Sequence, residues 1–240
     1  MYYTQAEILP HLAATRSPVG RYWLHWLIRW RRWLLRYHAA GGRVAKRAFD
    51  TGGSFLLLVL MSPLFLLLGL LIKLEDGGPV FFSQTRVGRF GREFRMYKFR
   101  SMRRNAEAQL AGLLGKNEHK EGVTFKLKHD PRITRTGRWL RRFSLDELPQ
   151  FFNVLKGDMS LVGPRPPTPR EVALYTLGDR RRLAVKPGIT CLWQISGRST
   201  IDFSGQVKLD VQYIETAGFW VDIKVLAGTL PAVVGGKGAC

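Results

Sequence analysis

The sequence is poor in the residues that build disulfide frameworks and metal sites. It contains two cysteines, Cys191 and Cys240, with no C-x-x-C pair, and its five histidines form no metal-ligand cluster with them. A Cys/His zinc site and a disulfide-rich scaffold are therefore excluded, and a reducing, cytoplasmic environment is expected. The first 20 residues have neither a positively charged start nor an apolar core, so no signal peptide is expected.

Acidic residues are also scarce. The 240 residues include 38 Lys and Arg but only 18 Asp and Glu, which gives a net charge of +20. This balance favours an anionic partner: lipid headgroups, nucleic acid or phosphorylated small molecules. The sequence has no helix-turn-helix signal and no recognisable RNA-binding motif, which argues against nucleic acid. Its length allows one membrane segment and one domain of ordinary size.

One long stretch has no charge at all. The 22 residues from Thr51 to Ile72 are uncharged and are interrupted by Ser62 and Pro63. Residues 54–72 would form a helix about 28 Å long, close to one hydrocarbon thickness. Pro63 lacks an N–H and would clash with the carbonyl of Val59, so a break is expected there. The stretch indicates a membrane segment that is broken at Ser62-Pro63.

The charges around this stretch bear on how it enters the membrane. Residues 1–50 carry nine Lys and Arg against two acids, and the remaining 190 residues carry 29 against 16. A spanning helix would place one basic segment outside, against the tendency of Lys and Arg to stay in the cytoplasm. A re-entrant hairpin keeps both inside. A kinked spanning helix is the alternative, because Pro is tolerated in such helices.

Residues 21–37 predict a second contact with the membrane. As a helix, they place aromatic and leucine side chains on one face and basic side chains on the other, as an interfacial helix does. A basic amphipathic helix can instead bind a protein or nucleic acid, but the neighbouring hydrophobic stretch favours the membrane surface. The two faces are Trp23, Leu27, Trp30 and Leu34, and His25, Arg29, Arg32 and Arg36.

Downstream, the sequence predicts a mainly helical α+β domain with a small β-hairpin. Residues 80–82 and 94–97 are typical of strands on either side of a Gly-rich basic connection at 86–92. The hydrophobic pattern predicts helices at 105–114, 203–217 and 220–234, and a buried strand at 191–195. Residues 135–143 are expected to form either a short basic helix or an extended segment. The apolar helix from Trp220 could lie in the core, on the membrane, or against a second copy in a homodimer.

The densest chemistry lies between Ser144 and Pro166. Ser144 is placed to cap a helix that runs to Lys156 and ends at Gly157. Ser144 and Glu147 would then form a capping box, which is a purely structural explanation for the Asp146-Glu147 pair.

A functional explanation of the same pair rests on the arginines around it. Positive charge keeps a carboxylate ionised, and hence nucleophilic or able to bind a metal. A divalent cation would be needed to bridge the carboxylate and an anionic phosphate. These observations make phosphoryl chemistry plausible beside the capping explanation. The arginines are Arg138, Arg141, Arg142 and Arg165.

The segment from Gly163 to Pro167 is stiff, because three of its five residues are proline. Such a loop can present Arg165 to a phosphate at low entropic cost, with Pro164 and Pro166 on either side. A plain linker between helices is the alternative.

These motifs occur in the order found in one family. They are Lys46-Arg47-x-Phe49-Asp50, Ser62-Pro63, Gln84-x-Arg86-Val87-Gly88, Lys98-Phe99-Arg100-Ser101-Met102, Asp130-Pro131-Arg132-Ile133-Thr134, Asp146-Glu147, Gly163-Pro164-Arg165-Pro166, Lys186-Pro187-Gly188-Ile189-Thr190 and Trp193-Gln194-x-Ser196-Gly197-Arg198. From about Arg43 to its end, the chain resembles the bacterial sugar transferases, which are monotopic polyprenyl-phosphate sugar-1-phosphate transferases (phosphoglycosyl transferases).

The resemblance implies a reaction and residues that perform it. A UDP-sugar and polyprenyl phosphate would give polyprenyl-diphosphate-sugar and UMP, the first membrane step of surface polysaccharide assembly. Asp146 would be the nucleophile and a ligand of Mg²⁺, and Glu147 its companion base or metal-orienting group. Lys98, Arg141 and Arg165 would contact phosphate, and Pro164, Arg165 and Pro166 would shape the nucleotide site. The Trp193-Gln194 motif favours glucose or galactose as the sugar.

The resemblance also implies an architecture. Residues 1–42 would form an N-terminal extension with the interfacial helix, residues 43–73 a re-entrant membrane helix broken at Ser62-Pro63, and residues 74–240 a catalytic domain. The protein would lie in the bacterial inner membrane, with this domain on the cytoplasmic leaflet. A membrane-anchored basic scaffold that binds nucleic acid is the non-enzymatic alternative, and a phosphatase or hydrolase is the enzymatic one.

Overall fold

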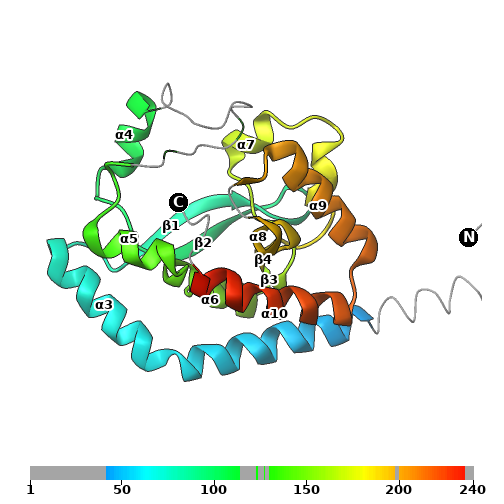
Figure 1. The fold of residues 1–240 in the computed structure, drawn as a ribbon, viewed down its shortest axis with the longest axis horizontal. Coiled ribbons are helices and arrows are strands. Elements are labelled where there is room, and N and C mark those ends of the chain that lie inside the picture. The colour runs from blue at the N-terminus through cyan, green and yellow to red at the C-terminus, as the bar shows by residue number, and fades with distance from the viewer. Residues whose placement is uncertain (1–41, 114–122, 124–126, 128–129, 198–199, 236–240) are drawn as a thin grey trace, which may run out of the picture. The chain divides into compact units, whose positions relative to one another are not determined.

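The computed structural model describes residues 42–113, 123, 127, 130–197 and 200–235 (Figure 1). The chain divides into two compact units, residues 1–49 and 50–240. The second unit is mainly helical and contains a small antiparallel hairpin, which confirms the coarse α+β prediction. The helix predicted at residues 21–37 lies outside the described residues.

The uncharged stretch forms two helices that meet at a sharp bend. One helix spans Gly42–Leu60 and α3 spans Ser62–Asp76, with an angle of 62° between them. Because Pro63 has no N–H to offer the carbonyl of Val59, that carbonyl accepts a hydrogen bond from the Ser62 hydroxyl at 2.8 Å. The break therefore falls where the sequence predicts it. Among the described residues, no helix alone has the length and apolarity to cross a bilayer, whereas this bent pair passes that test jointly.

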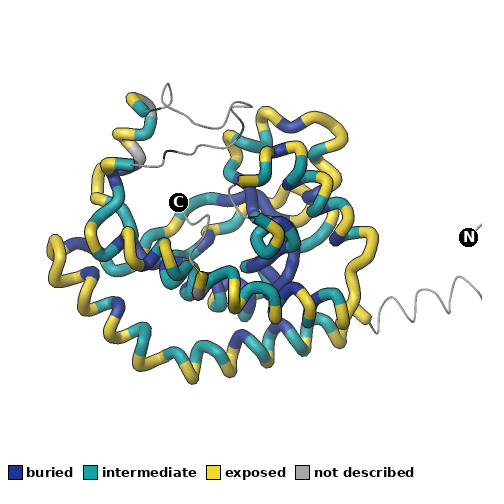
Figure 2. Tube along the Cα trace, in the orientation of Figure 1, coloured by how far each residue is buried: buried dark blue, intermediate teal, exposed yellow. Residues whose placement is uncertain are grey.

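The two sides of α3 differ. Leu68 and Ile72 are buried against Phe99 and Leu140, which fixes α3 to the rest of the second unit. The other side leaves a row of leucines uncovered, and exposed segments follow α3 along its length in Figure 2. An apolar surface of this kind marks a site of interaction rather than an ordinary solvated face. The uncovered residues are Leu66, Leu67, Leu70, Leu71 and Leu74.

The predicted hairpin is present and longer than expected. Strands β1 (Phe81–Val87) and β2 (Glu93–Phe99) pair in antiparallel register, with Phe82 opposite Lys98 and Arg86 opposite Phe94. The strands continue through the polar residues 83–86, whose side chains alternate between the two faces of the pair. A short 3₁₀ turn, η1 (Arg89–Gly91), connects them.

A second sheet is parallel and has two short strands, β3 (Ser160–Val162) and β4 (Gly188–Thr190). The strand predicted at 191–195 is wrong, because these residues begin α8 (Leu192–Ser196). A short apolar run does not distinguish a strand from a buried helix. Gly163 directly follows β3, and its backbone contacts that of Gly188, the first residue of β4. A Cβ on Gly188 would lie 2.1 Å from the Gly163 nitrogen. Only glycine allows this approach.

Asp50, the first residue of the second unit, is hydrogen-bonded to β3. Its carboxylate accepts a hydrogen bond from the Ser160 hydroxyl at 2.8 Å and from the Leu161 N–H at 3.2 Å. The side chain is buried, so these bonds compensate the loss of its hydration. The family motif that ends in Asp50 thus has a structural role here.

The remaining helices surround the two sheets. The hydroxyl of Tyr213 lies 3.0 Å from the Val162 carbonyl and 2.8 Å from Asp222, which joins the last two helices to β3. The helices predicted at 105–114, 203–217 and 220–234 are confirmed to within one residue at each end, and residues 135–142 form the short helix rather than the extended segment. The elements are α4 (Ala106–Leu113), α5 (Arg135–Arg142), η3 (Leu145–Glu147), α6 (Gln150–Lys156), α7 (Pro169–Ala173), η4 (Asp179–Ala184), α9 (Phe203–Thr216) and α10 (Phe219–Gly235).

Candidate active site

The acidic pair lies on a tight turn rather than in an α-helix. Ser144 has a left-handed backbone (φ 54°) and makes no capping bond with its side chain, so the predicted helix from Ser144 to Lys156 and its capping box are wrong. The reason is Pro149, which has no N–H for the Leu145 carbonyl. That carbonyl accepts the Leu148 N–H at 3.3 Å instead, and the turn η3 results. Helix α6 begins after it and ends at Gly157 as predicted.

This turn buries Asp146 and Glu147 beside a lysine from the hairpin. The Nζ atom of Lys98 lies 2.7 Å from Oε1 of Glu147 and 3.6 Å from Oδ2 of Asp146. Asp146 is only 6% exposed. One ammonium group therefore serves both carboxylates, and the structure brings together three residues that the sequence predicts for the site.

The pKa values of the two carboxylates are shifted in opposite directions. Burial raises the pKa of both, but at Glu147 the charges of Lys98 and Arg165 outweigh burial and hold the pKa at about 2. At Asp146, burial and the nearby charge of Glu147 prevail over Lys98 and Arg141, so its pKa lies above the ordinary value. The cations lower the pKa of both acids, as expected, but at Asp146 burial and the charge of Glu147 outweigh them, which the sequence did not predict.

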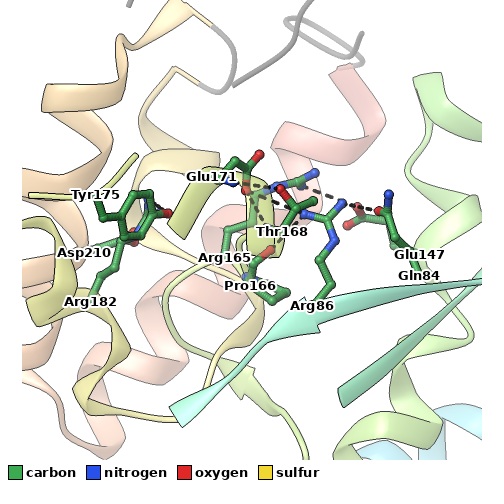
Figure 3. A network of polar contacts seen from close by, with 10 residues as sticks. All are labelled: Gln84, Arg86, Glu147, Arg165, Pro166, Thr168, Glu171, Tyr175, Arg182 and Asp210. Atoms are coloured by element: carbon green, nitrogen blue, oxygen red, sulfur yellow. Dashed lines mark hydrogen bonds and ion pairs between the residues drawn. The ribbon is translucent and has the colours of Figure 1, made fainter. Parts of the chain in front are cut away.

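The proline-rich loop places Arg165 as a second cation beside Glu147. An Nη1 atom of Arg165 lies 3.7 Å from Oε1 of Glu147, and its side chain is 40% exposed (Figure 3). A guanidinium that contacts the site and still faces solvent can reach a substrate phosphate.

Backbone hydrogen bonds anchor this loop at both ends, and the residue after it begins a helix. Thr168 and Glu171 form a true capping box at the start of α7. The loop therefore has little freedom to move Arg165. Its backbone bonds run from Gly163 N–H to Thr190 O at 3.0 Å, from Gly188 N–H to Pro164 O at 2.9 Å, and from Val87 N–H to Pro167 O at 2.8 Å.

The structure also shows a residue that was not predicted for the site. Arg86 is buried at the end of β1 and donates to the Pro166 carbonyl at 3.0 Å and to Gln84 at 2.8 Å. Glu171 lies 4.0 Å from it. The sequence held one signal, the Gln84-x-Arg86 motif, but nothing in the motif shows what Arg86 contacts.

The other arginines near the acidic pair differ in whether they face the site or the solvent. Arg141 is half-buried, and its charge acts on Asp146 to lower the carboxyl pKa. Arg138 and Arg142 are exposed on α5, next to Trp139, which is also 48% exposed. Of the cationic cluster, Arg141 and Arg165 therefore belong to the site, whereas Arg138 and Arg142 belong to the outer face of α5.

The residues present fit a magnesium ion that is held jointly with a substrate. Among the described residues, no three His, Cys, Asp or Glu side chains gather to hold a metal. Mg²⁺ does not need such a cage, because it commonly binds one or two carboxylates together with substrate phosphates and water. The carboxylate of Asp146 would be the oxygen ligand in such an arrangement.

Comparison with known proteins identifies the family. The bacterial sugar transferase family model matches residues 41–236. Galactosyl transferase CpsE of Streptococcus agalactiae is 52% identical over 206 residues, which cover 85% of this chain and 45% of that protein. Undecaprenyl-phosphate galactose phosphotransferase of Salmonella typhimurium is 45% identical over 200 residues, 82% of this chain and 42% of that protein.

A relative of similar length also matches. Exopolysaccharide production protein ExoY of Rhizobium meliloti is 40% identical over 201 residues, which cover 82% of this chain and 89% of that protein. The chain thus spans less than half of the two more similar relatives. The family match includes every element that builds the site, from the bent helix pair to α10. The chain belongs to the bacterial sugar transferase family.

Proposed function

We propose that this chain transfers a sugar-1-phosphate from a UDP-sugar to polyprenyl phosphate, releases UMP and forms a covalent intermediate on Asp146. The observation that carries the proposal is the buried Asp146-Glu147 pair, held by Lys98 and faced by Arg165. Cations around a carboxylate suit a transfer between two anionic substrates. The name of the Salmonella relative, which specifies undecaprenyl phosphate and galactose, supports the same acceptor and a hexose donor.

In the first step, an Oδ atom of Asp146 attacks the β-phosphorus of the UDP-sugar. The bond from that phosphorus to the bridging oxygen breaks, UMP leaves with the electron pair, and an acyl phosphate forms with the sugar still attached. In the second step, a phosphate oxygen of polyprenyl phosphate attacks the same phosphorus. The acyl phosphate bond breaks, and Asp146 returns as a carboxylate. Two steps at one site replace a direct reaction between two anions.

The neighbouring groups have roles that follow from their charges. Because Glu147 has a pKa of about 2, it stays ionised and holds Lys98 and Arg165 rather than accepting a proton. Lys98, Arg141 and Arg165 offset the charge of the substrate phosphates, and Pro164 and Pro166 fix the backbone on either side of Arg165. Asp146 would hold a Mg²⁺ ion, which would supply further positive charge to offset the diphosphate.

We also infer that the acceptor arrives from a membrane, with the catalytic unit on the cytoplasmic side. Leu145 and Leu148, which flank the acidic pair, pack against the cluster that holds Leu68 and Ile72 of α3. The acidic pair therefore lies next to the helix whose other side is apolar and uncovered. A lipid-borne phosphate can reach such a site without leaving the bilayer.

The test is UMP release by detergent-purified protein with Mg²⁺, polyprenyl phosphate and a panel of UDP-sugars that begins with UDP-galactose and UDP-glucose. Asp146→Asn is expected to abolish release, whereas Glu215→Gln, at an exposed ion pair, is expected to retain it. Without the lipid, about one equivalent of UMP and a covalent protein adduct are expected. Continuous UMP release without the lipid would instead identify a hydrolase, and release unaffected by Asp146→Asn would refute the nucleophile.

A further inference from the structure

The environment of Arg86 is unfavourable for a charged guanidinium. Arg86 is buried, and burial together with the nearby charge of Arg165 lowers its pKa to about 10. The carboxylates of Glu171 and Glu147 oppose this shift. A guanidinium that is buried close to a second guanidinium needs compensating contacts. In Figure 3 both arginines lie in one polar network with these two glutamates.

The compensating contacts are made to the loop that carries Arg165. Arg86 donates to the carbonyl of Pro166, and the N–H of the next residue, Val87, donates to the carbonyl of Pro167. Pro166 and Pro167 have no N–H, so only their carbonyls can anchor the loop. The end of β1 therefore holds two consecutive carbonyls through two consecutive residues.

The same face of the hairpin also holds the acidic pair. Residues directly opposite in an antiparallel pair share a face, and every second residue along a strand returns to it. Phe82 pairs with Lys98 and Arg86 pairs with Phe94, so Lys98 and Arg86 share one face. Lys98 binds Glu147, and Arg86 binds the loop of Arg165.

We propose that Arg86 is a positioning residue that sets the place of Arg165 opposite Glu147, and through it the place of the nucleotide sugar. The inference rests on the proposed function, because it gives Arg165 a substrate phosphate to contact. Arg86 itself does not touch the reacting atoms. The β-hairpin thus serves as a rigid frame, with Lys98 on one strand fixing the dyad and Arg86 on the other fixing the cationic loop.

The kinetic test is a double-mutant cycle between Arg86→Gln and Arg165→Gln. In the native background, Arg86→Gln is expected to lower kcat/KM for the UDP-sugar by about 10²-fold, as a misplaced binding group does. In the Arg165→Gln background, Arg86→Gln is expected to lower kcat/KM for the UDP-sugar by no more than about twofold. The loss should fall on KM for the UDP-sugar and leave KM for polyprenyl phosphate unchanged. Equal losses in both backgrounds would overturn the proposal.

A second test does not depend on activity. Hydrogen exchange of the Val87 amide should accelerate in Arg86→Gln, because the Pro167 carbonyl that it binds is no longer held in place. The amides of Gly163 and Ser160, which bind Thr190 and Pro187, should exchange as in the native protein. Arg86→Lys should be intermediate in both tests, because an ammonium group cannot hold Pro166 and Gln84 as a planar guanidinium does. An unchanged Val87 amide, or equal acceleration at all three amides, would refute positioning.

The two tests separate this inference from the proposed function. If the native protein releases no UMP from any UDP-sugar, the proposed function fails. The exchange rates still decide whether Arg86 holds the loop. If UMP is released and the effects of the two mutations are additive, the proposed function is supported and the positioning role of Arg86 is refuted.

Discussion

The ammonium group of Lys98 lies 2.7 Å from a carboxylate oxygen of Glu147, although 49 residues separate them in the sequence. The same ammonium lies 3.6 Å from Asp146, so one charge from β2 lowers the pKa of both acids. Of the two carboxylates, Glu147 is the closer and has the lower pKa. Glu147 therefore stays ionised at neutral pH, whereas the pKa of Asp146 lies above its ordinary value.

Lys98→Met should lower kcat/KM by about 10²-fold or more, because a preorganised cation beside the transferred phosphate is lost. The fold should persist, since the methionine stem fills a similar volume. Lys156→Met is the matched control, because Lys156 is 60% exposed and pairs only with Asp158 among the ion pairs of the described residues. Steady-state UMP release by the three proteins decides the matter, and equal activities would remove Lys98 from the mechanism.

The pH dependence of kcat/KM should show an ascending limb that reports Asp146. The nucleophile must be ionised, and burial raises its pKa above the ordinary 3.8, so activity should fall as pH drops through a midpoint above 3.8. Lys98 lowers this pKa, so Lys98→Met should move the limb to higher pH. A pH–rate profile of both proteins, with folding checked at each pH, provides the measurement. A limb at or below pH 3.8 would contradict the direction.

Asp210→Ala should destabilise the second unit by about 3–5 kcal/mol, because it leaves Arg182 buried without its carboxylate. Asp210 and Arg182 form a buried ion pair, and Arg182 also donates to Tyr175. The exposed pair Arg181–Glu215 is the control, and Glu215→Ala should cost less than about 1 kcal/mol. Free energies of unfolding measured side by side test the contrast, which similar values for both variants would refute.

Pro63→Ala should straighten the bent helix pair. Alanine supplies the N–H that the Val59 carbonyl lacks, and it removes the steric clash of the proline ring, worth about 3 kcal/mol in a helix. Spin labels at Phe55 and Leu74, both well exposed, should move apart in the variant in bilayers. The control is the Ser62→Ala variant with Pro63 retained, since it removes only the hydrogen bond from the Ser62 hydroxyl to the Val59 carbonyl. An unchanged distance would show that packing rather than Pro63 sets the 62° bend.

Local patterns predicted the fold well where one local cause dominates. Pro63 breaks its helix, Gly157 ends α6, and the periodic segment at 203–217 is a helix. Prediction failed at Ser144, where the capping pattern was outweighed by Pro149 five residues later. It also failed at 191–195, whose apolar residues suit a strand and a short helix equally.

The sequence by itself determined the family, the acidic pair, the stiff loop and the place of the helix break, because each depends on residues that lie close together in the chain. Only the tertiary structure decided which cations meet the acids. Lys98, Arg165 and Arg86 reach the site from β2, the loop and β1, and Arg86 binds a carbonyl 80 residues away. Burial, which raises the pKa of Asp146 while Lys98 and Arg165 lower that of Glu147, also exists only in the folded chain. The spacing of residues along the chain carries no information about these long-range contacts or about burial.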